Sequence, residues 1–343
     1  MGEQKTKHTS YDLAQMQSLP LEQKVIMSQR RIQEWYDYWD GQVYVSFSGG
    51  KDSSVLAYIA GQVCKLLNCK LILWFSDTGL EYPEIKQNVY TVADFIREKL
   101  GIEVELFVDY PKDRKGKRIT FRQVLEEYGY PIVSKQVSNV IKGARLSIQK
   151  GVDSTRLMNI QGRNTKKNGA PSKFNCKKWE YLLDSPFKIS DTCCEVMKKR
   201  PAKRFAKEHN LYPIVATMAE ESFNRTNKWY QYGCNAFNAK RPISKPMSFW
   251  TEQDVLKYIK TYHIPIASVY GEIKQDENDK YYTTGCNRTG CVFCGYGCHL
   301  EKEPNRFQQL KESHPKIYDY CMKPWDEGGL GMDEVLNYIN VKH

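Results

Sequence analysis

Six consecutive residues, Ser48-Gly49-Gly50-Lys51-Asp52-Ser53, combine the side chains and the backbone freedom that anion binding requires. The preceding segment, Val43–Phe47, is typical of a strand, and the following segment, Ser54–Ala60, has the apolar spacing of a buried helix. Glycines let backbone N–H groups approach an anion, and a helix N-terminus adds partial positive charge. With a lysine as countercharge and two serine hydroxyls as donors, the stretch predicts a phosphate site. The alternative is a glycine turn that binds nothing.

The spacing of residues 48–53 differs from that of one well-known type of phosphate loop and resembles that of another. A Walker A loop has four residues between its first glycine and Gly-Lys-Ser/Thr, and residues 48–53 do not match that pattern. The stretch instead resembles the PP-loop of the ATP pyrophosphatase and adenosine-phosphosulfate reductase superfamily. The resemblance implies that the chain binds an adenine nucleotide, either ATP or a sulfonucleotide (APS or PAPS).

Two groups of cysteines could hold a metal centre. The first is the tandem pair Cys193-Cys194, and the second spans residues 286–298, with thiols at Cys286, Cys291, Cys294 and Cys298. Four cysteines within thirteen residues could alone bind a [4Fe–4S] cluster or zinc.

The tandem pair also carries a family resemblance. Cys193-Cys194 followed by Lys198 and Pro201 resembles the Cys-Cys-x-x-x-Lys-x-x-Pro signature of bacterial adenylyl-sulfate reductases, and Gly290-Cys291-x-x-Cys294 resembles their second signature. The resemblance implies one [4Fe–4S] cluster that Lys198 tunes and four thiolates ligate. That set is Cys193, Cys194, Cys291 and Cys294. In the alternatives, Cys286 and Cys298 replace the tandem pair, or zinc replaces the cluster. DndC-like DNA phosphorothioation proteins resemble this combination of a cluster with a PP-loop domain.

Further segments of the chain resemble motifs of the phosphoadenosine phosphosulfate (PAPS) reductase family and occur in the same order. The stretch 77–84 resembles its adenosine-facing segment, which assigns Asp77 and Glu81 to the nucleotide. The stretch 220–225 resembles its Glu-x-Ser-x-x-Arg segment, in which Arg225 would face phosphate or sulfate. The common order identifies the chain as a member of this family from residue 43 onward. By that resemblance Lys51, Asp52, Lys198 and Arg225 are the candidate catalytic residues.

The sequence differs from the sulfonucleotide reductases in two features that matter for the reaction. The reductases attack sulfate with a cysteine in a C-terminal Glu-Cys-Gly-(Leu/Ile)-His tail, whereas the last nine residues here contain no cysteine, and Cys321 is the nearest candidate nucleophile. Met218 stands where the reductases carry an arginine. Both differences weaken the expectation of sulfonucleotide reduction.

Strands that alternate with helices predict the fold. Expected strands at 43–47, 71–77, 104–108 and 213–217, with intervening helices, indicate an α/β class with a doubly wound parallel sheet of the PP-loop type. We expect a helical lead-in over 1–40 and a nucleotide-binding domain over 41–265 with a basic insertion at about 112–180. A cysteine-rich segment over 266–343 follows.

Composition and charge bound the partners. The 343-residue chain carries a net charge of +11, which favours anionic partners. Between residues 135 and 178, Asp153 is the only acid among many Lys and Arg residues, with aromatic residues in or beside the segment. This pattern suits a nucleic acid but also a solvated face. The N-terminus has no apolar signal region and no stretch is long enough to span a membrane, so we expect a cytoplasmic protein without a membrane partner.

Three functions remain open at this stage. In the first, the enzyme adenylates an acceptor from ATP with Mg²⁺ and releases pyrophosphate, and the activated nucleic acid or small molecule then receives sulfur. In the second, it reduces APS or PAPS to sulfite. In the third, it is a nucleotide-binding subunit of a larger assembly with a structural cluster. The first two also imply a sulfur or electron donor, which could be a protein.

Overall fold

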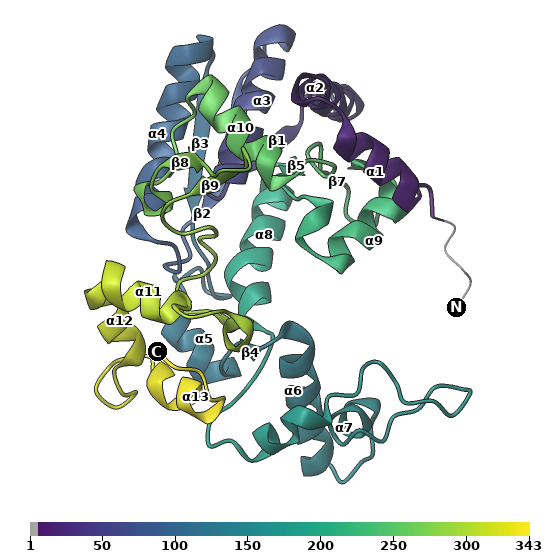
Figure 1. Ribbon diagram of the computed structural model, residues 1–343, viewed down its shortest axis with the longest axis vertical. Coiled ribbons are helices and arrows are strands. Elements are labelled where there is room, and N and C mark those ends of the chain that lie inside the picture. The colour runs from purple at the N-terminus through teal and green to yellow at the C-terminus, as the bar shows by residue number, and fades with distance from the viewer. Residues whose placement is uncertain (1–5) are drawn as a thin grey trace. The chain divides into compact units, whose positions relative to one another are not determined.

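A computed structural model describes residues 6–343, drawn in Figure 1. The chain divides into two compact units that interleave along the sequence. The first unit contains the described residues up to Asp77, together with Glu81–Tyr110 and Pro201–Thr289. The second contains Thr78–Leu80, Pro111–Arg200 and Gly290–His343. The predicted insertion at 112–180 lies within the second unit, and the predicted domain boundaries themselves stay a prediction.

The N-terminal lead-in consists of two helices, α1 (Ser10–Ser18) and α2 (Leu21–Tyr38). The Thr9 side chain accepts a hydrogen bond from the Asp12 backbone N–H and so caps α1. Pro20 separates the two helices because its ring disfavours helical geometry in the residue before it. The predicted helical lead-in is therefore present, and residues 1–5 of it lie outside the described part.

The first unit is built on a six-stranded sheet with the order β3-β2-β1-β5-β7-β6. All neighbouring pairs are parallel except β6 with β7. The strands are β1 (Val43–Ser46), β2 (Leu71–Ser76), β3 (Val104–Asp109), β5 (Tyr212–Val215), β6 (Asn235–Ala236) and β7 (Ile243–Ser244). This mostly parallel sheet confirms the predicted α/β class.

Alternating side chains explain why helices cover both faces of the sheet. Val43 and Val45 enter the large core, whereas Tyr44 between them packs with Trp74 and Phe205 on the opposite face. The large core also takes residues from α2, α3 (Lys51–Leu67), α4 (Pro83–Leu100) and α10 (Glu252–Tyr262). The other face is covered by α8 (Arg200–Glu208).

Further elements of the first unit lie outside the sheet. They are α9 (Phe223–Tyr232), the antiparallel pair of β8 (Ile273–Gln275) with β9 (Tyr281–Thr283), and two 3₁₀ helices, Ala219–Glu221 and Ser268–Tyr270.

The second unit contains short helices around one small parallel pair, β4 (Ile132–Val133) with β10 (Gly295–Tyr296). This pair joins two parts of the chain that lie far apart in sequence. The remaining elements are α5 (Phe121–Tyr128), α6 (Lys135–Gln149), α7 (Thr155–Ile160), a 3₁₀ helix (Lys177–Asp184), a π-helix (Glu195–Lys199), a short 3₁₀ helix (Cys298–Leu300), α11 (Arg306–Ser313), α12 (Pro315–Met322) and α13 (Met332–Tyr338). Within residues 6–343, no helix combines the length and the apolar character that crossing a membrane requires.

Candidate nucleotide and cysteine sites

The predicted phosphate loop, Ser48–Ser53, follows β1, and its last three residues are the first three of α3. Gly49 has a φ of +73°, and a Cβ there would lie 2.7 Å from the Ile85 carbonyl oxygen and 2.8 Å from Val89 Cγ2. Both the backbone conformation and the space therefore require glycine at this position. The Asn88 side chain donates a 2.9 Å hydrogen bond to the Gly49 carbonyl, so α4 fixes the turn from its buried side.

The loop hydroxyls bond to one another and to the loop backbone. The Ser48 and Ser53 hydroxyl oxygens lie 2.9 Å apart, and the Ser48 backbone N–H donates to Ser53 Oγ at 3.2 Å. Ser53 also donates to the Gly50 carbonyl at 2.9 Å. This network holds the loop in one shape, which is the preorganisation that an anion site needs.

Lys51 is buried and already paired. Its Nζ lies 2.6 Å from Glu252 Oε1 and donates to the Asn287 carbonyl at 2.6 Å. Its backbone N–H donates to the Tyr270 hydroxyl at 3.3 Å. The cation that the sequence assigns to phosphate is therefore held by the start of α10 and by the segment after Cys286.

Further charges surround the loop within the first unit. Arg225 and Arg288 both pair with Glu221, the latter at 3.5 Å, and Glu220 accepts the backbone N–H of Glu252 at 2.7 Å. Burial lowers the pKa of Arg225, and the charge of Arg288 acts in the same direction. Burial raises the pKa of Glu220. Three cations, counting Lys51, thus lie in one mixed-charge group beside a glycine turn.

Asp52 lies in the same group. Burial raises its pKa, whereas the charges of Lys51, Arg288 and Arg225 act to lower it. Its Oδ1 is shielded from solvent and receives no hydrogen bond from any residue between 6 and 343. A buried carboxylate oxygen without a donor is costly, so this atom is suited to face a bound cation or a protonated group.

Four residues of this group were not assigned a site role from sequence: Glu252, Tyr270, Asn287 and Arg288. Glu252 is recognisable from sequence only as part of a helix start. Asn287 and Arg288 lie between two cysteines, in a segment where the thiols dominate the pattern. The signal that could have found Arg288 is its position as a lone cation in that segment.

Asp77 and Glu81 follow β2, as the sequence predicts. Asp77 pairs with Lys86 of α4 at 2.6 Å, and its backbone N–H donates to the Asp109 carbonyl at 2.7 Å. Glu81 is half-buried and lies just before α4. Helix α4 therefore supports both the glycine turn, through Asn88, and the segment expected to meet adenosine.

The second unit brings four thiols into one electrostatic neighbourhood. Burial raises the pKa of the Cys193 thiol, and the charges of Cys291, Cys194 and Cys294 act in the same direction. Burial raises the pKa of Cys294 to about 11, with further contributions from Cys291 and Cys194. Among the described residues, however, no three His, Cys, Asp or Glu side chains are arranged as ligands around a single metal ion. Four thiols in one neighbourhood, with Cys193 buried and Cys194, Cys291 and Cys294 half-buried, fit a multi-iron cluster by donor chemistry.

Cys286 and Cys298 lie in other surroundings. Cys286 is in the first unit, and its pKa is raised by burial and lowered by a hydrogen bond with Tyr82. The Cys298 thiol donates to the Gly295 carbonyl at 3.1 Å, and burial raises its pKa to about 11.

A π-helix follows the tandem pair directly. It spans Glu195–Lys199, and the Arg200 backbone N–H donates to the Glu195 carbonyl. Such wide turns occur often at functional sites. Lys198 lies in this turn, and its charge acts to lower the pKa of Cys193. The tuning role that the resemblance implies for this lysine stays a prediction.

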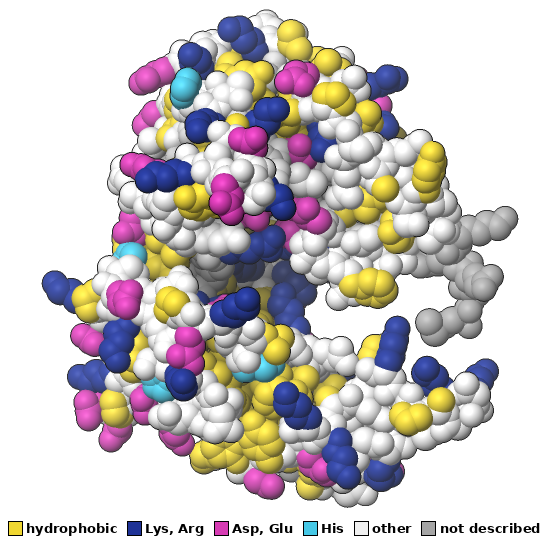
Figure 2. All heavy atoms as spheres, in the orientation of Figure 1, with side chains coloured by type: hydrophobic (Ala, Val, Ile, Leu, Met, Phe, Trp, Pro, Cys, Tyr) yellow, Lys and Arg dark blue, Asp and Glu magenta, His cyan; other side chains and the backbone are white. Residues whose placement is uncertain are grey.

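The basic segment 135–178 is partly used within the second unit. Arg145 donates five hydrogen bonds around the chain between Leu182 and Phe187, and Arg163 pairs with Asp153 at 2.9 Å. Lys142 pairs with Asp191 at 3.2 Å, two residues before the tandem cysteines. On the face drawn in Figure 2, Lys and Arg side chains spread over the surface that Figure 1 assigns to α6, α7 and the loop after α7. The exposed cations of the segment without an ion pair in the described residues are Lys135, Lys150, Arg156, Lys166, Lys167, Lys173, Lys177 and Lys178.

Comparison with known proteins supports the family resemblance. Residues 144–295 match the family model of the phosphoadenosine phosphosulfate reductase domain. The match includes both cysteine signatures and the segment around Arg225, and it begins after the glycine loop. Residues 144–295 are thus similar to the PAPS reductase domain, in line with the motifs.

One curated relative and two solved structures are also similar. The chain is 23% identical over 311 residues to an uncharacterized protein of Methanocaldococcus jannaschii, covering 89% of this chain and 53% of that protein, so it spans about half the length of this relative. The U34-tRNA thiolase NcsA from Methanococcus maripaludis, solved with its [4Fe-4S] cluster, is 14% identical with a TM-score of 0.36, covering 94% of this chain and 82% of its own. NMN synthetase from Francisella tularensis is 13% identical with a TM-score of 0.33, covering 72% and 73%.

Proposed function

We propose that this PAPS reductase-like chain cleaves ATP between its α- and β-phosphates, adenylates an acceptor and releases pyrophosphate. The observation that carries the proposal is the mixed-charge group beside the glycine turn, with Lys51, Arg225 and Arg288 as its cations. An oxygen of the acceptor attacks the α-phosphorus, and the bond to the β-phosphate oxygen breaks. The three cations would stabilise negative charge on the attacked phosphate and the leaving pyrophosphate.

The existing ion pairs suggest how ATP is received. Glu252 and Glu221 now neutralise the cations that the phosphates would need. A polyphosphate can replace these carboxylates as the partner, so binding exchanges one set of charge pairs for another. The preformed pair with Glu252 would keep the buried Lys51 amine from being left without a counter-charge when the site is empty.

Mg²⁺ fits this site as a partner of the nucleotide. Because Mg²⁺ commonly binds through one or two carboxylates plus substrate phosphates, it does not require a complete set of protein ligands. Asp52 has a shielded oxygen without a hydrogen-bond donor in residues 6–343, and we assign it as the protein ligand. The ion would supply Lewis-acid stabilisation of charge on the phosphate oxygens.

A [4Fe–4S] cluster would be held by Cys193, Cys194, Cys291 and Cys294, because their thiols share one electrostatic neighbourhood. Bound there, it would supply sulfur-binding or electron-transfer chemistry. Sulfur at the sulfide level, brought by a donor, would displace AMP from the activated acceptor, which exchanges oxygen for sulfur without a net change of oxidation state. The exposed cations of the 135–178 segment favour a nucleic acid as the acceptor.

Reduction of APS or PAPS is the second candidate, favoured by the match to the reductase domain. It needs a thiolate nucleophile, and Cys321 is the candidate that sequence offers. This thiol is completely buried, and burial raises its pKa, so the reactive thiolate form is disfavoured. A partner's thiol would then have to attack the sulfate. A nucleotide-binding subunit with a structural cluster is the third candidate, and it would bind ATP without turnover.

Two assays on anaerobically purified protein test the proposal. Pyrophosphate release from ATP should fall at least 100-fold in Lys51→Ala and Arg288→Ala, while Lys65→Ala, an exposed lysine on the same helix as Lys51, should stay within twofold of wild type. Sulfite from APS without pyrophosphate from ATP would instead establish the reductase, and ATP binding without either product would establish the third candidate.

Iron content tests the ligand set separately. Serine replacement of each of the four grouped cysteines should lower bound iron and visible absorbance, whereas Cys286→Ser and Cys298→Ser should retain both. Loss of iron in Cys286→Ser or Cys298→Ser would show that the local cysteine set is the correct one.

A further inference from the structure

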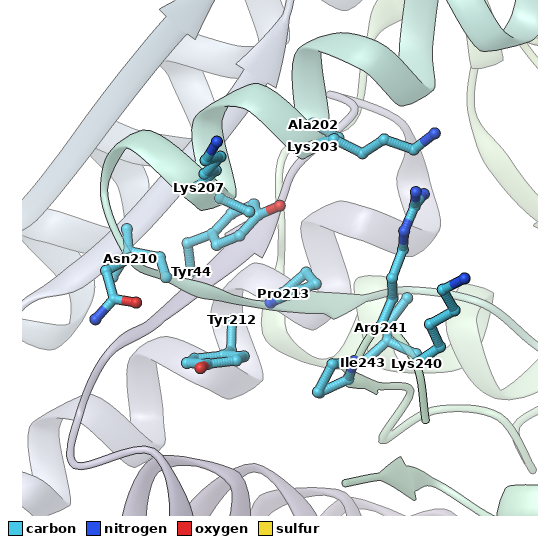
Figure 3. A pocket seen from close by; sticks show the side chains of 13 residues that line it. Tyr44, Ala202, Lys203, Lys207, Asn210, Tyr212, Pro213, Lys240, Arg241 and Ile243 are labelled. Atoms are coloured by element: carbon cyan, nitrogen blue, oxygen red, sulfur yellow. The ribbon is translucent and has the colours of Figure 1, made fainter. Parts of the chain in front are cut away.

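A cavity of about 420 Å³ lies in the first unit, on the sheet face that α8 covers (Figure 3). It is lined by α8, by β1, by the start of β5 and by the segment that enters β7. Tyr44, Pro213 and Ile243 are among the first two residues of β1, β5 and β7, so the cavity lies toward the amino ends of these parallel strands. The glycine loop follows the carboxyl end of β1, and the cavity is therefore separate from the proposed ATP site.

The strand alternation gives the cavity an apolar floor. Pro213 is the parallel partner of Tyr44, so both side chains lie on the face that α8 covers. Ile243 precedes Ser244, which pairs with the core residue Ile214, and the Ile243 side chain therefore points away from the large core, to the same face. The other apolar side chains that line this face are Ala202, Ala206 and Leu211. A volume in the range of small-molecule sites and a mostly apolar lining suit the apolar part of a small ligand.

One polar atom of this lining has no partner. The Tyr44 side chain is only 1% exposed and packs edge-on against Trp74 and Phe205. Its hydroxyl makes no hydrogen bond to any residue in the described part of the chain, and burial raises the pKa of this hydroxyl, so it stays a proton donor. Figure 3 shows the hydroxyl oxygen pointing toward the side on which Lys203 and Arg241 lie. A buried hydroxyl is stabilised when an acceptor meets it, so the site favours a ligand with an acceptor oxygen at this point.

The mouth of the cavity is cationic. Lys203 and Lys207 line it from α8, Lys240 and Arg241 line it from the segment before β7, and none of the described lining residues is acidic. Figure 3 shows the charged ends of Lys203, Lys240 and Arg241 on the same side of the cavity. Within residues 6–343, Lys207, Lys240 and Arg241 form no ion pair, so their charges are available to an anion.

We propose that this cavity binds a small organic anion with an apolar body. The apolar body would lie on Pro213 and Ile243, and the anionic group would accept a hydrogen bond from the Tyr44 hydroxyl and pair with Arg241, with Lys240 on the same side. A guanidinium can donate two parallel hydrogen bonds to a carboxylate or to a phosphate, so both anionic groups share this chemistry. A simple inorganic anion would leave the apolar floor uncovered, and a neutral apolar molecule would leave the cations and the hydroxyl without a partner.

Calorimetric titration of the full chain with octanoate and with octyl phosphate tests the proposal. Octanol has the same apolar chain without the charge, and acetate and inorganic phosphate have the charge without the chain. We expect wild type to bind at least one of the two amphipathic probes, at least tenfold more tightly than octanol and than the matching simple anion. The tighter probe identifies the anionic group that the site prefers.

Variants of the lining test the contribution of each part. Lys240→Gln/Arg241→Gln should weaken binding of the tighter probe at least tenfold, and Tyr44→Phe should weaken it several-fold. Lys65→Gln/Lys257→Gln removes the same charge from exposed positions on α3 and α10 and should stay within twofold of wild type. Ala206→Leu should reduce binding by filling the cavity without changing its charge.

Binding should persist in Lys51→Ala, which separates this site from the ATP site and from the proposed reaction. Three results would overturn the proposal: no binding of either amphipathic probe, binding of octanol or of a simple anion as tight as that of the better probe, or equal weakening in the control variant with both exposed lysines replaced.

Discussion

Replacement of Gly49 by alanine tests the physical basis of the phosphate loop. With a φ of +73°, Gly49 has the left-handed conformation, which costs an alanine about 1–2 kcal/mol. The added Cβ would also lie 2.7 Å from the Ile85 carbonyl oxygen and 2.8 Å from Val89 Cγ2. Both neighbours belong to α4 and are buried, so we assign about 1–3 kcal/mol to the overlap. The sum predicts a loss of about 2–5 kcal/mol in the free energy of unfolding.

Gly41 provides a matched control for the conformational part of this cost. Its φ is +72°, and a Cβ there would meet nothing within 4 Å. Gly41→Ala should therefore lose only about 1–2 kcal/mol. The difference between the two variants isolates the overlap with α4.

Urea unfolding of both variants, followed by tryptophan fluorescence, measures the difference directly. We expect Gly49→Ala to be less stable than Gly41→Ala by about 1–3 kcal/mol and to lose ATP binding, while Gly41→Ala retains it. Equal destabilisation would refute the steric argument, and normal ATP binding by Gly49→Ala would refute the assignment of the loop to phosphate.

Three further variants test the charges and the thiol. Glu252→Gln removes the carboxylate partner of the buried Lys51 amine, so stability should fall by about 1–3 kcal/mol, and saturating ATP should shrink the loss in thermal melts. If saturating ATP left the loss of stability unchanged, the account in which Lys51 exchanges Glu252 for a phosphate would be contradicted. Because burial raises the pKa of Asp52, the native state favours its protonated form, and wild type gains stability as the pH falls through that raised pKa. Asp52→Asn should therefore be more stable than wild type at neutral pH, and the difference should vanish in acid. If urea unfolding gave parallel curves of stability against pH for the two proteins, the raised pKa of Asp52 would not be the cause of the difference. Cys321→Ser should leave pyrophosphate release within twofold of wild type, and a large loss would reveal a role for this buried thiol.

The strands and the loop were predictable because their signals are local. Val43–Ser46 alternates between two apolar faces, and the glycine turn lies between this strand and a helix with strong apolar spacing. The tandem cysteines and the Cys291–Cys294 pair were likewise recognisable from their spacing.

The partners of the loop were not predictable, because they come from distant parts of the chain. Glu252 and Asn287 contact Lys51 across 201 and 236 residues, and no local pattern marks such a contact. Helix α6 shows a different limitation. Its Ser134 cap and its buried Val137 and Ile141 were hidden by the basic composition of the segment, which drew attention to a nucleic-acid surface rather than to a packed helix.

Phosphorus NMR of the products from ATP, with anaerobically purified protein and added single-stranded RNA or DNA, tests the central proposal most directly. We predict AMP or an adenylated acceptor together with pyrophosphate, and loss of both in Lys51→Ala. ADP with inorganic phosphate would contradict cleavage between the α- and β-phosphates, and unchanged turnover in Lys51→Ala would contradict the assignment of this loop as the site.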